Sequence, residues 1–342
     1  MRIKTFSGDF YEIGKQQGKI YSKNGVSFDY VRVNPKLYRN QLKIYQRYYP
    51  ELLEEFKGIA EAGNFDKDKL IYSFLCEEIL FFLKKFHIKP IYTIFGVKNK
   101  NGVFVGRNYD WIPITEKFFK VYKVLNPKRN SFIAVTDMGI LNKKMVNSKF
   151  LYYTVVDAIN DKGLYIGFTF AYCKRWSFGL SCVHMAKLIT ETCSNVKEAI
   201  KVFENVPLCC PKNFFLADKN GQMVAIEHIV KKFKVVYPNN DILIKTNHYI
   251  DPELAKEDLV LKIDRNHSTF RRYYEVFRKI SAIKEKLKQS DIVEILKDKK
   301  SGIYQDNEKR KTIWTLSLNM INRNYMLYWG LPEKRRQKIL KI

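Results

Sequence analysis

Two β-rich runs joined by a tight turn limit the folds open to this chain more than any other feature. Residues 92–111 read YTIFGVKNKNGVFVGRNYDW, and the dipeptide Asn101-Gly102 stands between the two runs. Asn-Gly tolerates the positive φ angles of a short hairpin loop, so this stretch predicts two antiparallel strands. We therefore expect an antiparallel sheet near the middle of the fold.

Further β-rich runs follow the first hairpin. They occupy residues 122–127, 131–137, 150–172, 213–229, 233–248 and 311–332. Several contain an Asn-Asp-Lys-Gly or Lys-Asn-Gly turn, which favours hairpins over the long crossovers that parallel strands need. The sheets are predicted to be mainly antiparallel.

Helical patterns are collected in separate blocks. After an initial strand the first ninety residues are mostly helical, with Pro50 placed to begin one helix and Gly63 to end it. Gly14 and Gly18, four residues apart, predict a helix that approaches a neighbour closely. Two later helical blocks cover residues 181–206 and 267–298. Helices segregated from antiparallel strands indicate an α+β fold, with two sheets stacked between helical layers.

Composition places the chain among globular proteins. Of its 342 residues 46% are hydrophobic, and no low-complexity tract interrupts them. The longest apolar run, residues 72–85, is too short for a membrane span and contains Glu77 and Glu78, so it predicts a buried helix. The first residues lack the apolar run of a secretory segment, and we expect a cytoplasmic protein.

Cysteine and histidine spacing gives no sign of a metal site. The six cysteines include the adjacent pair Cys209 and Cys210 but no Cys-x-x-Cys motif, which also fits a reduced compartment. Four histidines have no spacing typical of metal ligands: His184, His228, His248 and His267. We expect no metal and no cofactor.

A net charge of +26 is the strongest compositional anomaly. Such a charge attracts polyanions, and the sequence predicts at most weak electrostatic binding to anionic partners. The lysines are spread along the chain, and two denser blocks lie at residues 265–274 and 333–342. These blocks are either one basic face or the solvated sides of helices.

Several segments in a fixed order resemble one enzyme family. They are GDFYEIGKQQG at 8–18, YPELLEEFKGIAEAGN at 49–64, VGRNYDW at 105–111, INDKGLYIGF at 159–168, LITETCSNVKEAIKVFENVP at 188–207, FFLADKNGQMVAIE at 214–227, KTNH at 245–248 and residues 312–332. The chain resembles the penicillin acyltransferase (peptidase C45) group of N-terminal nucleophile hydrolases, and related bile-salt and penicillin V amidases share the central block.

The resemblance implies a fold and a reaction. The fold would be a four-layer αββα sandwich with two stacked, mainly antiparallel sheets. Residues 1–91 would be a helical region equivalent to a pro-segment, packed on a core of residues 92–342 within one structural domain. Family members cut their own chain and use the new N-terminal residue to hydrolyse, or transfer an acyl group from, a linear amide. The free amine, with a pKa of about 8, serves as general base.

The position of the family nucleophile holds a tyrosine. Similar proteins have a Cys-Thr pair about ten residues before the hairpin glycine, and that count leads to Tyr92 and Thr93. A phenol with a pKa of about 10 is a poor nucleophile at neutral pH. Three explanations are open. The chain is an inactive relative that keeps the pocket for binding, or it is cut before Thr93, which would then be the nucleophile. The third is that the family nucleophile aligns with a residue other than Tyr92, or that activity follows another route. A shift of one residue sends a strand side chain to the opposite face of the sheet, which speaks against Thr93.

The other family positions keep plausible residues. The resemblance makes Asp110 the carboxylate that holds the new amine, Arg107 a cation beside the nucleophile or substrate, and Asn247 an oxyanion-hole donor. It also suggests that Asn108 and Trp111 shape the pocket and that Gln305 replaces an arginine of some members. Cys76 is predicted to be a buried structural residue. We expect a small amide or acyl ligand, with self-cleavage and amidase activity absent or very weak.

Overall fold

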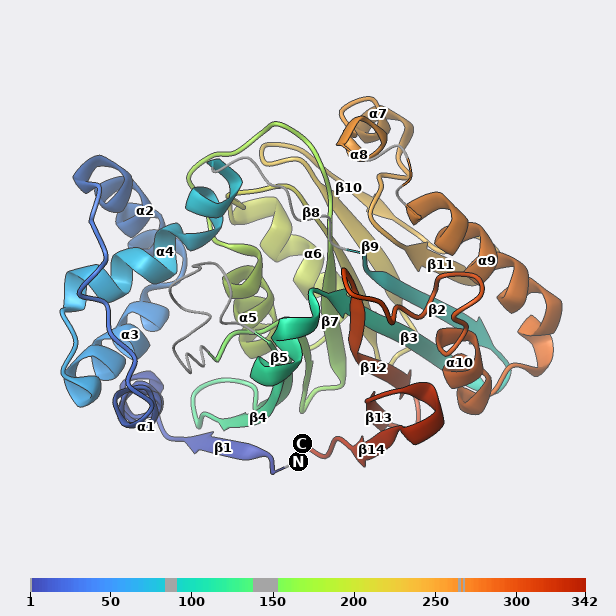
Figure 1. The fold of residues 1–342 in the computed structure, drawn as a ribbon, viewed down its shortest axis with the longest axis horizontal. Helices are drawn as coiled ribbons and strands as arrows, with labels where there is room; N and C mark the ends of the chain where they lie inside the picture. The colour runs from blue at the N-terminus through green and yellow to red at the C-terminus, as the bar shows by residue number, and fades with distance from the viewer. Residues whose placement is uncertain (1, 84–90, 138–152, 264–265, 267) are drawn as a thin grey trace.

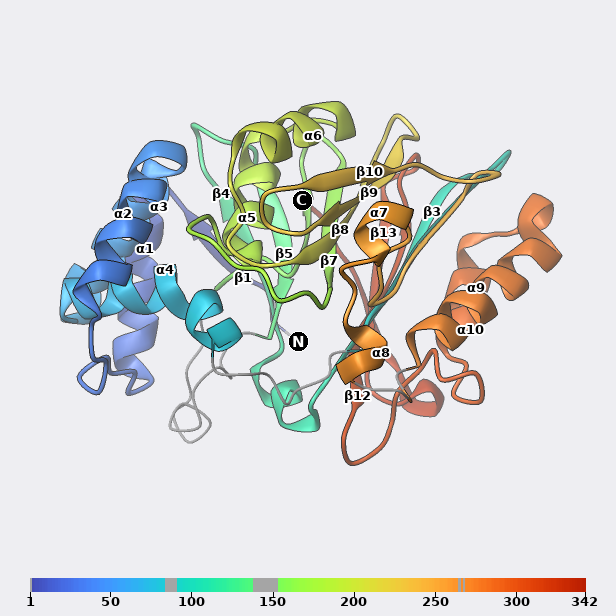
Figure 2. The ribbon, with the colours of Figure 1, turned by 90° about the horizontal axis from the view of Figure 1, so that it is seen from above.

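The computed structural model describes residues 2–83, 91–137, 153–263, 266 and 268–342. Within them two β-sheets are stacked face to face, and helices cover the outer face of each sheet (Figure 1, Figure 2). The α+β class and the two stacked, mainly antiparallel sheets expected from the sequence are therefore confirmed.

The larger sheet has eight strands in the order β1-β4-β5-β6-β7-β8-β9-β10. Their bounds are β1 Lys4–Ser7, β4 Lys120–Leu125, β5 Phe132–Thr136, β6 Asp157–Asn160, β7 Leu164–Phe170, β8 Lys212–Asp218, β9 Met223–His228 and β10 Phe233–Val236. β1 runs parallel to β4, and every other neighbouring pair is antiparallel. The extreme N-terminal segment thus contributes an edge strand to this sheet.

The smaller sheet has six strands in the order β11-β2-β3-β12-β13-β14, all antiparallel. Their bounds are β2 Thr93–Asn99, β3 Gly102–Trp111, β11 Ile242–Lys245, β12 Lys311–Asn319, β13 Asn324–Trp329 and β14 Arg336–Ile339. The predicted hairpin is the pair β2–β3, but its loop lies one residue earlier than expected. Asn99 pairs with Gly102, so Lys100 and Asn101 form the loop, and only Gly102 has a positive φ, of 139°.

Two layers of helices enclose the sheets. α5 (Cys182–Thr192) and α6 (Val196–Asn205) pack on β6–β9 of the larger sheet. α9 (Thr269–Ile283) and α10 (Gln289–Leu296) pack on β2, β3, β11 and β12 of the smaller sheet. Figure 2 shows this order of helix, sheet, sheet and helix from above. The short elements are α7 Pro252–Ala255, α8 Val260–Ile263, η1 Pro113–Phe118, η2 Lys284–Lys286 and η3 Pro332–Lys334.

The N-terminal helices form a group beside the larger sheet (Figure 1). They are α1 Phe10–Lys23, α2 Pro35–Tyr48, α3 Pro50–Gly63 and α4 Lys67–Leu83. A Cβ atom on Gly14 would lie 2.0 Å from the carbonyl oxygen of Glu55, so the close helix approach predicted from the glycines is confirmed for α1 and α3. α3 begins at Pro50 and ends at Gly63 as expected, and Cys76 is buried within α4.

Buried charges connect this helical group to the core. The Lys187 ammonium group on α5 lies 2.8 Å from Glu55 of α3 and 2.5 Å from Glu191, and all three side chains are buried. The Tyr49 hydroxyl donates to Glu191, and the Tyr45 hydroxyl lies 2.7 Å from the Nδ1 atom of His184. These buried polar groups favour a single packing of the helices. If the helices separated, each group would lose its partner, which is costly for a buried polar or charged group.

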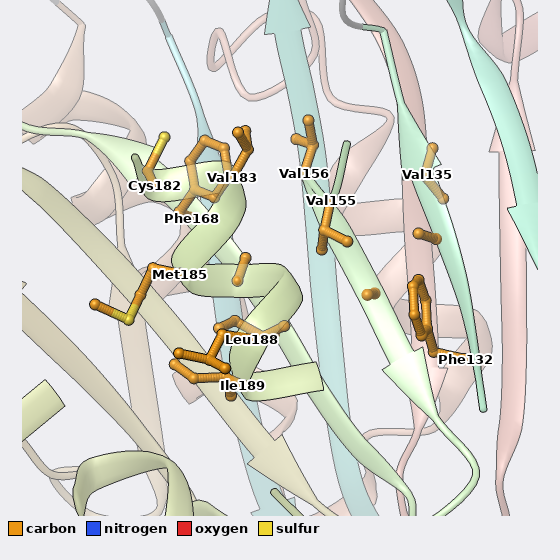
Figure 3. Close-up of a cluster of buried hydrophobic side chains, with 14 of the residues drawn as sticks. Phe132, Val135, Val155, Val156, Phe168, Cys182, Val183, Met185, Leu188 and Ile189 are labelled. Carbon is orange, nitrogen blue, oxygen red and sulfur yellow. The ribbon is translucent and has the colours of Figure 1, made fainter. Parts of the chain in front are cut away.

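Apolar side chains fill the space between α5 and the larger sheet. Figure 3 shows Val183, Leu188 and Ile189 of α5 close to strand residues such as Phe168. All of these side chains are at least nine-tenths buried. Apolar side chains also pack between the two sheets. Met223 and Phe215 of the larger sheet lie so close to Gly96 of β2 that a Cβ atom on this glycine would collide with them. The stacked sheets hold the hairpin β2–β3 rigidly at their interface.

Candidate functional site

The hairpin β2–β3 presents two different faces. Side chains alternate along a strand, so residues 92, 107, 109 and 111 share one face and residues 93, 108 and 110 share the other. The first face lies against the larger sheet, and the second lies against α9 and α10. The residues predicted for one site are therefore divided between two sides of the smaller sheet.

The Tyr92 side chain lies in an aromatic stack between the sheets. Its ring centroid is 4.8 Å from that of Tyr109, 5.9 Å from that of Trp111 and 5.8 Å from that of Phe170 on β7. The residue is fully buried, and burial raises its pKa well above that of an exposed tyrosine. A phenol without solvent and with a raised pKa stays protonated, which makes it a poor nucleophile.

The Arg107 guanidinium group lies over the Tyr92 ring, 4.8 Å from its centroid. Its Nε atom is 3.3 Å from Oδ1 of Asp157, and Oδ2 of the same carboxylate accepts a hydrogen bond of 2.9 Å from the Trp314 indole. The cation is thus neutralised between the sheets and paired with an aromatic face. Arg107 thus contacts the Tyr92 ring; a role toward a nucleophile or substrate stays a prediction.

Arg272 of α9 occupies the other face of the hairpin. It is fully buried, and its Nη1 atom donates to the carbonyl oxygen of Tyr92 and, at 2.9 Å, to Oγ1 of Thr93. Its Nη2 atom donates to Oδ1 of Asn247 at 3.0 Å. Burial lowers the pKa of Arg272 to about 10, while nearby Asp110 opposes this. One guanidinium group therefore joins Tyr92 and Thr93 at the start of β2 to Asn247, which follows β11.

Sequence reasoning missed Arg272, although a signal was present. Arg272, Val276 and Ile280 recur at every fourth position and form the buried stripe of α9. An arginine within such a stripe indicates a buried cation with a specific partner, because an unpaired buried charge is very costly.

Asp110 lies on the same face of the hairpin as Thr93. Its Oδ1 atom accepts a hydrogen bond from the Thr312 hydroxyl, whereas its Oδ2 atom has no hydrogen-bond partner among the described residues. Burial raises the pKa of Asp110 to about 7, although the Thr312 hydrogen bond and Arg272 lower it. Such a carboxyl group can exchange a proton near neutral pH. Its predicted contact with an amine at position 92 is not among the described hydrogen bonds.

Asn247 connects the start of β2 to β7. Its Oδ1 atom accepts a hydrogen bond of 2.8 Å from the backbone N–H of Tyr92. Its Nδ2 atom donates to the carbonyl oxygen of Phe170 at 3.1 Å. The structure thus brings Asn247 to Tyr92, as the sequence predicted. The oxyanion-hole role stays a prediction, and only the second N–H of the amide would be available for it.

Asn108 and Trp111 do not share a pocket floor, in contrast to the prediction. The Asn108 amide donates at 2.9 Å to the carbonyl oxygens of Leu296 and Ile303, and its oxygen accepts from the Thr315 hydroxyl at 2.7 Å. These bonds fasten α10 and the loop after it to β3. Trp111 lies on the opposite face, because strand side chains alternate.

Two cavities reach this region from different sides. A polar cavity of about 370 Å³ is lined by Gln305, Ile91 and Arg271, among others. A mainly apolar cavity of about 490 Å³ has these lining residues: Glu78, Phe81, Phe82, Leu83, Phe170, Ala171, Tyr172, Cys173, Lys174, Trp176, Cys210, Pro211, Lys212 and Leu259. Phe170 thus contacts Tyr92 and also forms part of the apolar cavity wall.

The apolar cavity contains one buried ion pair. Lys212 is paired with Glu78, and its ammonium group lies 4.0 Å from the centroid of the Phe170 ring. Across residues 2–83, 91–137, 153–263, 266 and 268–342 we find no group of three or more His, Cys, Asp and Glu side chains arranged to hold a metal ion. His267 lies outside these residues.

Comparison with known proteins identifies the family. The model of the family Acyl-coenzyme A:6-aminopenicillanic acid acyl-transferase matches residues 97–334, well over half of the chain. The chain belongs to this family. The match includes Arg107, Asp110 and Asn247 but begins after Tyr92 and Thr93. Family membership therefore does not decide which residue, if any, acts as nucleophile. No curated protein sequence matches the chain significantly.

The chain is similar in fold to several solved structures. A variant of conjugated bile acid hydrolase from Clostridium perfringens has a TM-score of 0.49 and 14% identity, over 72% of this chain and 92% of that chain. Penicillin V acylase from Agrobacterium tumefaciens has a TM-score of 0.47 and 15% identity, over 72% and 86%. An N-acylethanolamine-hydrolyzing acid amidase ortholog from Caenorhabditis elegans has a TM-score of 0.47 and 13% identity, over 67% and 93%.

None of the described helices is both long enough and apolar enough to cross a lipid bilayer.

Proposed function

We propose that this chain binds a ligand with an apolar acyl group and neither cuts itself at the Ile91–Tyr92 bond nor hydrolyses amides through residue 92. The observation that supports this most is the burial of the Tyr92 ring among Tyr109, Trp111 and Phe170. The ring occupies the position that the resemblance assigns to a small nucleophile, and it is bulky, protonated and shielded from water.

The ligand site in this proposal is the apolar cavity behind Phe170. Its volume of about 490 Å³ falls within the range of small-molecule pockets, and its walls are mostly aromatic and aliphatic. The Lys212–Glu78 pair supplies a charged point at which a polar head group or amide could be oriented. An acyl chain or aryl acyl group fits this combination of surfaces.

Two measurements test the proposal together. The intact mass of the purified chain should correspond to one species of about 40.6 kDa. Incubation with N-acyl amides of increasing chain length should raise the melting temperature, because a ligand that binds only the folded state stabilises it.

A variant of the cavity wall tests where the ligand binds. Leu259→Trp narrows the cavity and should raise the apparent Kd for the N-acyl amide at least tenfold. Leu331→Trp, outside the cavity, is the matched control. Release of a free acid product, or an unshifted melting temperature, would contradict the proposal.

A second candidate function is self-cleavage before Thr93, which would make Thr93 the N-terminal nucleophile. One observation favours it. Arg272 Nη1 donates both to the carbonyl oxygen of Tyr92, which such a reaction would attack, and to Oγ1 of Thr93, which would attack it. A cation at the carbonyl oxygen stabilises the negative charge that develops there.

The steps of this reaction balance without a cofactor. Thr93 Oγ1 would bond to the Tyr92 carbonyl carbon while its proton passes to a base, for which Asp110 lies on the same face of the hairpin. The Tyr92–Thr93 C–N bond would then break, and the Thr93 nitrogen would take up the proton. Water would finally hydrolyse the ester and leave a free amine at Thr93.

Mass spectrometry distinguishes this candidate from the family cut. Fragments of residues 1–92 and 93–342 would support it, and they differ by one tyrosine from the fragments of a cut before Tyr92. Thr93→Ala should then abolish the fragments, and Thr93→Ser should retain them. An uncut wild-type chain after prolonged incubation at pH 7 to 8 would reject the Thr93 reaction and agree with the first proposal.

A further inference from the structure

The exposed face of α2 consists of cations without anions. The helix has the sequence PKLYRNQLKIYQRY, which contains no aspartate or glutamate. Its exposed charged residues are Lys36, Arg39, Lys43 and Arg47, and exposed Arg32 lies just before it. At 100° per residue the four helix cations fall within one strip of the surface. This strip is separate from the basic blocks that the sequence pointed to.

A groove runs along this strip. It has a volume of about 950 Å³, and its lining residues are Arg32, Val33, Asn34, Pro35, Lys36, Arg39, Asn40 and Lys43. No carboxylate is among them. Within the part of the chain that the structure describes, none of Arg32, Lys36, Arg39 and Lys43 forms an ion pair. Exposed Lys299, by contrast, is paired with Asp306 and Glu333. Among the described residues, no carboxylate thus neutralises these groove cations.

We propose that this α2 groove binds the phosphate backbone of a nucleic acid. From Lys36 to Lys43, the helix cations that line the groove, the helix rises by about 10 Å, at about 1.5 Å per residue. Successive phosphates along one strand advance by about 3.4 Å, so a backbone lying in the groove brings several phosphates within reach of the cations. Asn34 and Asn40 add polar groups that can donate to phosphate oxygens. The net charge of +26 adds long-range attraction for the same partner.

A nucleic acid fits this surface better than a membrane does. Helices that bind the membrane interface place large apolar side chains beside their cations, so that these enter the lipid. α2 has no large exposed apolar side chain, because its apolar side faces the protein. That side is also fixed by polar contacts: the Gln41 amide donates to the carbonyl oxygens of Leu75 and Gly179. Substitutions on the exposed strip therefore leave the anchoring side unchanged.

Fluorescence anisotropy with a short labelled DNA duplex and a single-stranded RNA tests the proposal. The full chain should bind at low salt, with an affinity that falls linearly on a log–log plot against salt. The triple variant Lys36→Gln, Arg39→Gln, Lys43→Gln should bind at least tenfold more weakly. For the DNA duplex, the slope of the logarithm of the binding constant against the logarithm of the salt concentration should also decrease in magnitude by about 2.7. This corresponds to three phosphate contacts at about 0.9 each. The control Lys197→Gln, Lys201→Gln, Lys231→Gln removes the same charge from other exposed positions.

Three outcomes would overturn the inference. The wild-type chain could fail to bind either nucleic acid at low salt. The control triple variant could weaken binding as much as the groove variant, which would assign binding to net charge alone. Vesicles containing phosphatidylserine could bind more tightly than nucleic acid and depend on the same three residues, which would assign the groove to a membrane. Circular dichroism and melting of both triple variants confirm that each remains folded.

Discussion

Tyr92 and Thr93 are neighbours in the chain, yet their side chains lie on opposite faces of the smaller sheet. The Tyr92 ring contacts Phe170 of the larger sheet, and the Thr93 hydroxyl accepts a hydrogen bond from Arg272 of α9. The Asp110 carboxyl group is on the Thr93 side, whereas the Arg107 cation is on the Tyr92 side. The question of which residue could act is therefore a question of which face of the hairpin is used.

The aromatic stack around Tyr92 should contribute measurably to stability. Tyr92→Ala removes a fully buried ring and should lower the free energy of unfolding by about 3–5 kcal/mol. Tyr92→Phe keeps the ring contacts with Tyr109 and Arg107 and should cost no more than about 1 kcal/mol. Urea denaturation of both variants measures the difference. Equal losses would show that the hydroxyl, and not the ring, is the important group.

Arg272 should be far more important for stability than the adjacent arginine. Arg272→Met would leave the Tyr92 carbonyl oxygen and the Asn247 amide oxygen without this buried donor and would remove a cation near Asp110, and we expect a loss of about 3–5 kcal/mol. Arg271→Met changes an exposed side chain and should cost less than about 0.5 kcal/mol. Thermal and urea unfolding check both. Similar values for the two variants would contradict the buried contacts described for Arg272.

Asp110 should make stability depend on pH. Its pKa is raised from the ordinary 3.8 to about 7 by burial, so the folded chain holds this proton more tightly than the unfolded chain. The contribution of protonated Asp110 to the free energy of unfolding is fully present below about pH 4 and is lost as the pH rises to about 7. The side chain in Asp110→Asn is neutral at every pH. The free energy of unfolding of this variant should therefore decrease less between pH 5 and pH 8 than that of the wild-type chain.

The control for this effect is Asp241→Asn, at an exposed position whose φ of 60° suits asparagine. This variant should keep the wild-type pH dependence. Buried Asp137, whose pKa burial also raises to about 7, retains part of the slope in every variant. An unchanged slope in Asp110→Asn would show that Asp110 is ionised across the whole range.

The N-terminal helices should remain attached to the core even after any cut near residue 92. Lys187 joins Glu55 of α3 to Glu191 of α5, and β1 is a strand of the larger sheet. Lys187→Met leaves two buried carboxylates unpaired and should destabilise the chain by about 3–5 kcal/mol. Adding Glu55→Gln and Glu191→Gln should recover part of this loss. Fragments that separate on gel filtration without denaturant would contradict the expectation.

Local signals predicted much of the fold. The Asn-Gly hairpin, the Pro50 helix start and the glycine pair of α1 all depend on backbone preferences that act over a few residues. The hairpin loop was placed one residue late, because the sequence does not specify which residue adopts the positive φ. The expected α+β class followed from the order of these elements and from the family resemblance.

The site was predicted only in part. Tyr92, Arg107 and Asn247 come together, since the contacts join β2, β3 and the end of β11. Asn108 was assigned to the pocket, but its amide holds α10 against the sheet. Arg272, far away in the sequence, was not recognised at all.

The sequence by itself determined the elements and the family, because these depend on residue identity and short-range spacing. Only the tertiary structure decided which face of the hairpin each side chain occupies and which partners meet it there. Stacking of the second sheet against one face and of α9 against the other is a long-range event. It shields Tyr92 from water and places Arg272 beside Thr93.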